Sequence, residues 1–328
     1  MHPQWYHGRD KNPPFFEGWY FKLVDRTERH AYAIIPGVFL SRDPAESHAF
    51  IQVLAGHRDQ VFFQPYPFEE FWAADSAFDI RVGASRFTAE HIRLDLRAPA
   101  LNLQGELSFT GRTPWPVTWH APGTMGWYAW MPFLETYHGV ISLDHTIQGS
   151  LALNDQSLDF TGGRGYIEKD WGKSFPEGWL WFQSNHFDSR GTSLTASVAI
   201  VPWLFRSFPG FTIGLWHAGR LYRFATYTGA SITDLVITDE RASVIVHDRD
   251  HRLELEVWRA GAGMLHAPSP TGMNRRTPET LNAKLEVRLT NAAGETLLRD
   301  TGRHSGLETG GNVERLMGLW AKETLEKV

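Results

Sequence analysis

The chain has 328 residues, no cysteine and a formal net charge of −5. This length suits one large domain or two of ordinary size. The lack of cysteine excludes a disulfide framework, a thiolate metal site and a cysteine nucleophile. The mild acidity argues against a nucleic-acid partner, because phosphate binding needs clustered Lys and Arg.

The hydropathy of the chain predicts a protein of the cytoplasm. Residues 1–14 are polar and contain prolines, without the apolar run of a signal peptide. No run of 18 apolar residues occurs, so we expect no membrane-spanning helix. Peripheral contact with a membrane, through which a lipid substrate would be collected, stays open.

Tryptophan is the residue type in excess. The chain has 14 of them, several times the roughly 1% of ordinary proteins. Trp is large and carries an N–H that needs a partner when it is buried. So many of them predict an aromatic-lined cavity, and the alternative is that they only fill the cores of β-domains.

Most of the chain alternates apolar and polar residues with the period of a β-strand. In chain order, a helical turn is expected at residues 68–74, between strands that are separated by turn signals such as Asn154-Asp155. The clearest strand patterns are residues 93–97, 194–200, 243–247, 253–257 and 284–289. One helix is expected, from Asn312 to about Lys327, as a packing strap with Leu316 and Trp320 on its apolar face.

An internal repeat divides the chain. Residues 15–19 (Phe-Phe-Glu-Gly-Trp) match residues 175–179 (Phe-Pro-Glu-Gly-Trp). At similar offsets, residues 33–36 match residues 199–202. Further matches in the same order pair Tyr6 with Tyr166, Asp10 with Asp170, and Leu101-Asn102 with Leu281-Asn282. We interpret these as a duplication that gives two antiparallel barrels, residues 1–160 and residues 161–328 with the C-terminal helix.

Several common catalytic and metal motifs are missing. There is no Gly-x-Ser-x-Gly elbow, Walker loop, Gly-x-Gly-x-x-Gly or His-Glu-x-x-His. His247 and His251 are four residues apart, but they flank a charged turn between two expected strands. We therefore expect no metal and no cofactor.

The segment before the second repeat concentrates the groups that could carry chemistry. Glu168 and Asp170 are two residues apart, so they would share one face of a strand. By the same rule Trp179, Trp181 and Gln183 share a face, and Asn185 follows them. This row suggests a ligand-binding wall, and the alternative is that it closes a barrel. Glu17 and Glu177 recur in both halves, so we expect them to pair with Lys or Arg near the Trp ring.

Three stretches of the chain resemble the tocopherol cyclase family. Residues 15–22, 168–176 and 179–187 are similar to that family's FFEGWYF and EKNWG phrases and its Trp-x-Trp-x-Gln-x-Asn-x-Phe stretch. The resemblance extends loosely from residue 15 to 300. Asp170 stands where the cyclases have Asn. A more distant resemblance is to carotenoid 1,2-hydratases, whose fold implies two lipocalin-like (calycin) barrels.

The resemblance implies addition of an O–H across a prenyl double bond, a cyclisation or hydration that needs no redox cofactor. The substrate would be a hydrophobic prenylated or terpenoid molecule. Either Glu168 or Asp170 would be the general acid, unless Glu168 only pairs with Lys169 or Lys173. The other implied site residues bind the substrate, stabilise the cation or orient the oxygen: Trp19, His138, Tyr166, Trp171, Trp179, Trp181, Gln183 and Asn185.

Two other functions are compatible with this fold. A lipocalin-like barrel can be a non-catalytic carrier of a hydrophobic molecule, or a structural protein with a vestigial cavity. The acid pair at Glu168 and Asp170 favours an enzyme, since a carrier needs no inward-facing carboxylate.

Overall fold

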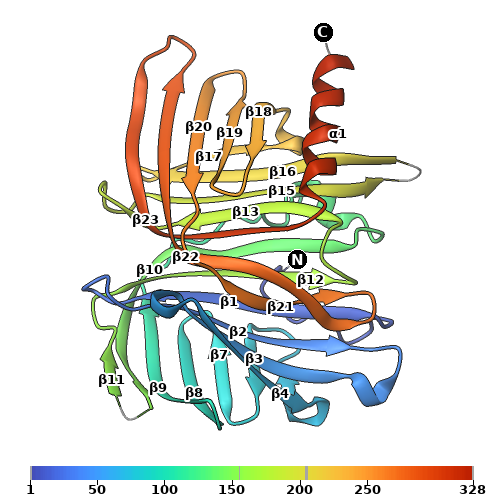
Figure 1. Cartoon of the computed structure of the whole chain (residues 1–328), viewed down its shortest axis with the longest axis vertical. Coiled ribbons are helices and arrows are strands. Elements are labelled where there is room, and N and C mark those ends of the chain that lie inside the picture. The colour runs from blue at the N-terminus through green and yellow to red at the C-terminus, as the bar shows by residue number, and fades with distance from the viewer. Residues whose placement is uncertain (1, 155, 204–205, 327–328) are drawn as a thin grey trace. The chain divides into compact units, whose positions relative to one another are not determined.

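The computed structural model describes residues 2–154, 156–203 and 206–326, with side chains described as far as residue 321. Within these residues the chain is nearly all-β, with one α-helix, α1 (Val313–Glu326). The strands form two antiparallel sheets, of 12 and 11 strands (Figure 1). In the part of the chain described, no helix is long and apolar enough to cross a membrane. The all-β class and the C-terminal helix are confirmed.

The first sheet has the strand order β4-β3-β2-β1-β12-β10-β9-β8-β7-β6-β5, with β11 beside β10. Its strands are β1 (Phe15–Val24), β2 (Ala31–Leu40), β3 (His48–Ala55), β4 (Gln60–Pro67), β5 (Phe71–Ala73), β6 (Asp79–Val82), β7 (Ser85–Thr88), β8 (His91–Ala98), β9 (Leu101–Thr110), β10 (Thr136–Leu153), β11 (Gln156–Asp159) and β12 (Arg164–Gly172). Ile51 of β3 and Ile80 of β6, from distant places in this order, belong to one buried core with Phe21 of β1. The sheet therefore curls around its own core, as in a barrel.

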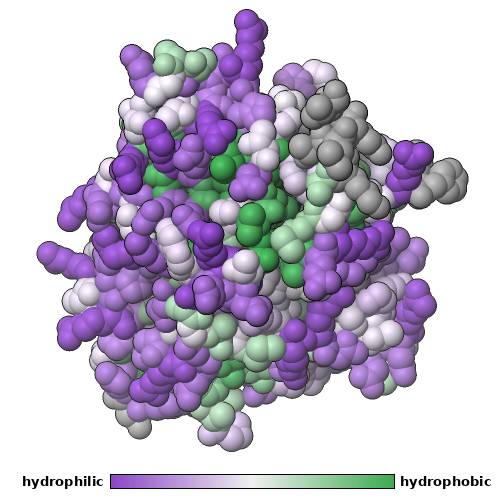
Figure 2. Space-filling view, turned by 45° about the horizontal axis from the view of Figure 1, so that its top comes forward, coloured by the Kyte–Doolittle hydropathy of each residue, from purple (hydrophilic) through white to green (hydrophobic). Residues whose placement is uncertain are grey.

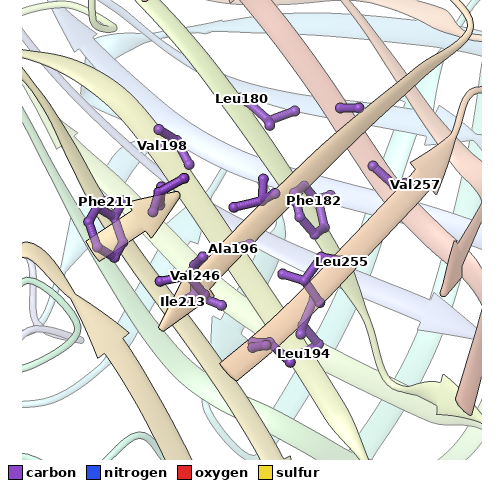
Figure 3. Close-up of a cluster of buried hydrophobic side chains, with 14 of the residues drawn as sticks. Leu180, Phe182, Leu194, Ala196, Val198, Phe211, Ile213, Val246, Leu255 and Val257 are labelled. Carbon is purple, nitrogen blue, oxygen red and sulfur yellow. The ribbon is translucent and has the colours of Figure 1, made fainter. Parts of the chain in front are cut away.

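The second sheet has the order β17-β16-β15-β13-β23-β22-β20-β19-β18, with β14 beside β23 and β21 beside β22. Its strands are β13 (Gly178–Ser184), β14 (His186–Phe187), β15 (Ser193–Trp203), β16 (Arg206–His217), β17 (Arg220–Ala225), β18 (Ser231–Ile237), β19 (Arg241–His247), β20 (His251–Trp258), β21 (Gly263–Ser269), β22 (Gly272–Asn291) and β23 (Thr296–Gly311). Leu180 and Phe182 of β13 point into a second core with Leu255 of β20 (Figure 3).

Short 3-10 turns and α1 complete the structure. The turns are η1 (Pro44–Glu46), η2 (Gly56–Arg58), η3 (Phe68–Glu70), η4 (Gly126–Trp130) and η5 (Thr226–Thr228). The turn expected at residues 68–74 is therefore η3, followed by the short strand β5. Leu316 and Trp320 of α1 are buried in the second core, as the apolar face of the helix predicts.

Many outward-facing strand positions are hydrophilic. In β20, Glu254 and Glu256 are partly exposed, while Leu253 and Leu255 between them are buried. Hydrophilic side chains cover most of the face seen in Figure 2, and hydrophobic ones gather toward the middle of its upper part. In a strand such as β20, the period-2 pattern thus predicts which side faces a core.

The two sheets share one strand order, which supports the duplication. The run β4-β3-β2-β1-β12-β10-β9 in the first sheet corresponds to β17-β16-β15-β13-β23-β22-β20 in the second. Residues 15–19 and 175–179 lead into β1 and β13, and residues 33–36 and 199–202 lie in their partners β2 and β15. These two matches fall on corresponding strands and are confirmed.

The other sequence matches are wrong. Tyr6 and Asp10 precede β1, whereas Tyr166 and Asp170 lie in β12, whose counterpart is β23. Residues 101–102 open β9, while residues 281–282 lie in β22, the counterpart of β10. A short stretch of similar sequence does not show which strand its residues pair with. Strand pairing decides which strands of the two sheets correspond.

The chain divides into two compact units. The first contains residues up to 129, residues 135–175 and residues 263–276, and the second contains residues 130–134, residues 176–262 and residues from 277 onward. The main boundary between the two units falls after residue 175, not at the expected residue 160. The reason is that β12 completes the first sheet between β1 and β10. Residues 263–276 join the first unit through Gln52, which bonds to the backbone of His266 at 3.3 and 2.7 Å.

Candidate active site

Strands β10 and β12 of the first unit place an acidic cluster on one face of the sheet. Tyr166, Glu168 and Asp170 alternate along β12, so their side chains lie on the same side. His138 of β10 is directly opposite Asp170 in the antiparallel register, and Val140 is opposite Glu168. Directly opposite residues share a face, so His138 joins the other three.

Two hydrogen bonds and one ion-pair contact make these side chains one connected group. His138 Nδ1 lies 2.9 Å from Asp170 Oδ1, and His138 Nε2 lies 3.6 Å from Glu168 Oε2. The Tyr166 hydroxyl donates a short hydrogen bond to Glu168 Oε2. Tyr166 and Glu168 are buried, whereas the Asp170 side chain is 29% exposed. We call His138, Glu168 and Asp170 the acid triad, and Tyr166 is hydrogen-bonded to it. The acid triad extends from the partly exposed carboxylate of Asp170 to the buried carboxylate of Glu168.

His138 is positively charged in this setting. Burial by itself would lower its pKa, but the carboxylates of Glu168 and Asp170 outweigh burial and raise the pKa of His138 to about 9. An imidazolium donates from both ring nitrogens, which matches a carboxylate on each side. Near neutral pH the proton therefore stays on His138, between two carboxylates.

A β-bulge lies beside the triad. The register of β10 with β12 shifts between Val140 and Ser142, and again between Ser142 and His145. At the same place Val140 N–H donates to Thr124 Oγ1 at 2.8 Å. Bulges often lie next to active sites, where they re-aim a side chain.

The triad also has the donors of a metal site. One ligand atom each from His138, Glu168 and Asp170 lie within 4.8 Å of one another. Nitrogen and carboxylate oxygen ligands of this kind suit Zn²⁺ and related ions. A metal ion would have to displace the proton of His138, because an imidazolium has no lone pair to offer.

The charged state of His138 predicts a pH dependence of stability. Its folded-state pKa, about 9, lies above the ordinary value of 6.5. The stabilisation is therefore complete below about pH 6.5 and is lost as the pH rises through 9. It amounts to on the order of 3 kcal/mol, since a tenfold change in proton affinity corresponds to about 1.4 kcal/mol. Urea unfolding at a series of pH values should show this loss.

His138→Gln is the comparison that isolates the effect. Lys169 has a pKa lowered to about 8, which makes the opposite contribution between pH 8 and 10.5, and both proteins contain it. We expect the stability advantage of the unaltered protein over His138→Gln to shrink between pH 6.5 and 9. An advantage that stays constant over this range would contradict a charged His138.

The opposite face of β12 carries a buried ion pair. Lys169 Nζ lies 2.5 Å from Glu17 Oε1, and both side chains are fully buried. The ammonium lies 5.1 Å from the centre of the Trp19 ring and 4.7 Å from that of Trp171. His7 N–H donates to both carboxylate oxygens of Glu17, at 3.2 and 2.9 Å. This cluster joins the N-terminal segment to β1 and β12.

The repeated glutamates form ion pairs in both units. Glu177 pairs with Arg315 of α1 in the second unit, as Glu17 pairs with Lys169 in the first. The prediction that both pair with a Lys or Arg is therefore confirmed. The second pair is about half exposed, with side chains 43% and 45% exposed, so only the first is desolvated.

The family model described as tocopherol cyclase-like matches residues 13–311. The chain belongs to the tocopherol cyclase-like family. The range includes both sheets and every residue of the acid triad.

Two curated plant proteins are similar to this chain. Over 201 residues the chain is 27% identical to a chloroplastic tocopherol cyclase of Zea mays, which covers 57% of this chain and 42% of the maize protein. Over 208 residues it is 26% identical to a probable chloroplastic tocopherol cyclase of Oryza sativa subsp. japonica, covering 60% and 44%. The chain thus spans less than half the length of these relatives.

Solved structures share the fold. CghA in complex with Sch210972 aligns with a TM-score of 0.56 at 11% identity, over 91% of this chain and 89% of that one. Kievitone hydratase from Nectria haematococca aligns with a TM-score of 0.53 at 12% identity, over 90% and 87%. At such identities the likeness concerns the fold alone.

Within this family fold, the aromatic residues expected beside the acid are divided. Trp19 and Trp171 lie with Lys169 on the core-facing side of the sheet, opposite to Glu168. His7 stacks on Trp171 with 4.6 Å between ring centres. The structure does not bring these two Trp residues together with the acid, because neighbours in a strand point to opposite faces.

The predicted row in the second unit lies on one face of β13. Trp179, Trp181 and Gln183 are buried and alternate with the core residues Leu180 and Phe182. They therefore point away from the second unit's own core. Asn185 Oδ1 lies 3.0 Å from His186 Nδ1, just after the end of β13.

The sequence pattern did not reveal two further carboxylates, both of which are buried. Glu308 of β23 accepts a hydrogen bond from Trp179 Nε1, and its cross-strand partner is Glu279 of β22. Both glutamates are buried. Glu308 is flanked by Leu307 and by glycines at 306, 310 and 311. A carboxylate among glycines and beside an apolar residue is the signal that would have marked it.

Proposed function

We propose that this protein is a cyclase or hydratase in which Glu168 protonates an alkene of a prenylated or terpenoid substrate, without a redox cofactor. The observation that carries the proposal is a buried glutamate held between a tyrosine hydroxyl and a protonated histidine. Membership of the tocopherol cyclase-like family supports the reaction class and a lipophilic substrate.

Glu168 is a better proton donor to an apolar alkene than Asp170. Only 5% of its side chain is exposed, against 29% for Asp170. An apolar substrate meets the acid where water is excluded, which favours the buried carboxyl. Asp170 holds the other nitrogen of His138 at 2.9 Å, so we assign it the role of orienting and charging that ring.

The net charge of the triad explains when Glu168 becomes an acid. Two carboxylates and one imidazolium sum to −1. A lipophilic substrate that displaces water leaves that charge without solvation, which is costly. Uptake of one proton brings the sum to zero. The proton resides on Glu168, because Asp170 keeps its direct hydrogen bond to His138.

The proposed reaction balances without any oxidant or reductant. Glu168 gives its proton to one alkene carbon, and the π electrons form the new C–H bond, which leaves a tertiary carbocation. An oxygen of the substrate's own phenol or of water then forms the C–O bond. That oxygen loses its proton to the Glu168 carboxylate, which restores the acid. Tyr166, which donates to Glu168 Oε2, keeps the carboxyl in one orientation.

The buried row of Trp179, Trp181, Gln183 and Asn185 is proposed as a substrate-binding surface of the second unit. Aromatic faces stabilise cations, and the amides offer hydrogen bonds to an oxygen. No step of the reaction is assigned to these residues.

Turnover in D₂O tests the proposal. A phenol with a prenyl chain beside its hydroxyl is the probe, and the cyclic ether or tertiary alcohol is analysed by mass spectrometry. We expect one deuterium per product molecule, on the carbon that receives the proton. Activity should persist with EDTA, because no metal takes part in the proposed steps.

Two results would contradict the proposal. A product without deuterium at that carbon would mean that the alkene is not protonated by an exchangeable acid. Tight binding of the phenol without any product would instead favour the carrier function.

A further inference from the structure

The segment that connects β9 to β10 has an unusual composition. Residues 113–134 contain no Asp, Glu, Lys or Arg, although they include four Trp. Val117 and Trp119 are 45% and 79% exposed, and Trp127 is 41% exposed. We call residues 117–127 the aromatic turn. An exposed, uncharged stretch rich in Trp marks an interaction site more than an ordinary solvated loop.

The geometry of the aromatic turn presents Trp119 at its tip. Thr118 and Ala121 exchange backbone hydrogen bonds, of 3.0 and 3.2 Å, and Thr118 Oγ1 also accepts from Ala121 N–H. Trp119 and His120 are the two residues between them, with 4.2 Å between ring centres. Turn corners usually hold Gly, Asn, Asp or Pro. A Trp held at this corner exposes a large apolar ring in a fixed position.

The chemistry of the aromatic turn fits the surface of a lipid bilayer. Trp is enriched at membrane interfaces, where its ring meets the acyl region and its N–H stays hydrated. The absence of charged side chains means that no ion has to be desolvated when the turn enters the headgroup layer. It also argues against a nucleic acid or an acidic protein, which would need basic residues.

The aromatic turn is bonded to the strand that carries the acid triad. Thr124 Oγ1 accepts from Val140 N–H at 2.8 Å, and Met125 Sδ lies 3.1 Å from His138 N. Thr124 is itself buried. Docking at Trp119 would thus hold the β10 end of the site near the lipid phase in which an apolar substrate is dissolved.

We propose that the aromatic turn docks on a lipid bilayer, with Trp119 inserted among the headgroups. Only the reason for docking, collection of a lipophilic substrate, rests on the proposed function. Docking itself is measured without substrate. Failure of the docking proposal is therefore distinguishable from failure of the proposed function.

Flotation with phosphatidylcholine vesicles tests this proposal on the full chain. We expect Trp119→Ser to lower the vesicle partition coefficient by about tenfold, the effect of withdrawing one large aromatic ring from the interface. Trp72→Ser is the matched control. Trp72 is also exposed, at 47%, in the same unit, but Arg81 lies over its ring at 4.7 Å. The Trp72→Ser variant should bind vesicles as the unaltered protein does.

Binding should also be nearly independent of salt, because no charge is involved. Three outcomes would overturn the proposal. They are equal binding by Trp119→Ser and the unaltered protein, loss of binding at high salt, and a dimer in sedimentation without vesicles that Trp119→Ser abolishes. The last would show that a second copy of the chain covers the aromatic turn.

Discussion

Glu168→Gln is expected to lower turnover of a prenylated phenol by about 10²–10⁴-fold, the usual contribution of a general acid. The amide keeps the size of the side chain and can still accept from Tyr166, but it has no proton to give. Substrate binding should change little, so the loss falls on kcat and not on KM. Initial rates under saturating substrate measure it.

Asp170→Asn is the control for Glu168→Gln. Asp170 lies 2.9 Å from His138 and accounts for part of the charge that raises the pKa of this ring. Its replacement should therefore move the pH profile of kcat to lower pH and leave substantial activity. Full activity of Glu168→Gln, or a larger loss in Asp170→Asn than in Glu168→Gln, would transfer the acid role to Asp170.

Lys169→Met is expected to cost about 3–5 kcal/mol of unfolding free energy, because it leaves the buried Glu17 carboxylate without its counter-ion. Met has a similar length and lacks the charge. The ring contacts with Trp19 and Trp171 also lose their cation. Urea unfolding, followed by circular dichroism, measures the change.

The corresponding pair in the second unit provides a matched control. Glu177 and Arg315 have side chains 43% and 45% exposed, so Arg315→Met should cost no more than about 1 kcal/mol. Adding Glu17→Gln to Lys169→Met should recover part of the loss, because the buried charge is then gone. Equal costs at the two pairs, or no recovery in the double variant, would contradict the assigned role of burial.

The sequence alone determined the fold class and singled out Glu168 and Asp170 as the candidate acids. Alternation of apolar and polar residues depends only on the chain, so it predicted the strands and the shared face of Glu168 and Asp170. The repeat around Glu-Gly-Trp identified the strand that begins each sheet. His138 and Tyr166 entered the sequence prediction only as residues that would orient the oxygen nucleophile, not as partners of the acid.

Tertiary structure decided what these residues contact. The pairing of β10 with β12 sets His138 opposite Asp170, although 32 residues separate them along the chain. The same pairing places β12 in the first sheet, so the boundary between the two units falls after residue 175 and not at residue 160. It also separated Trp171 from Glu168, neighbours in the motif but on opposite faces of one strand. A sequence pattern shows the period with which side chains alternate along a strand. Strand register and burial arise only when distant segments pair. Register and burial together set the charge and the role of each ionisable side chain in the site.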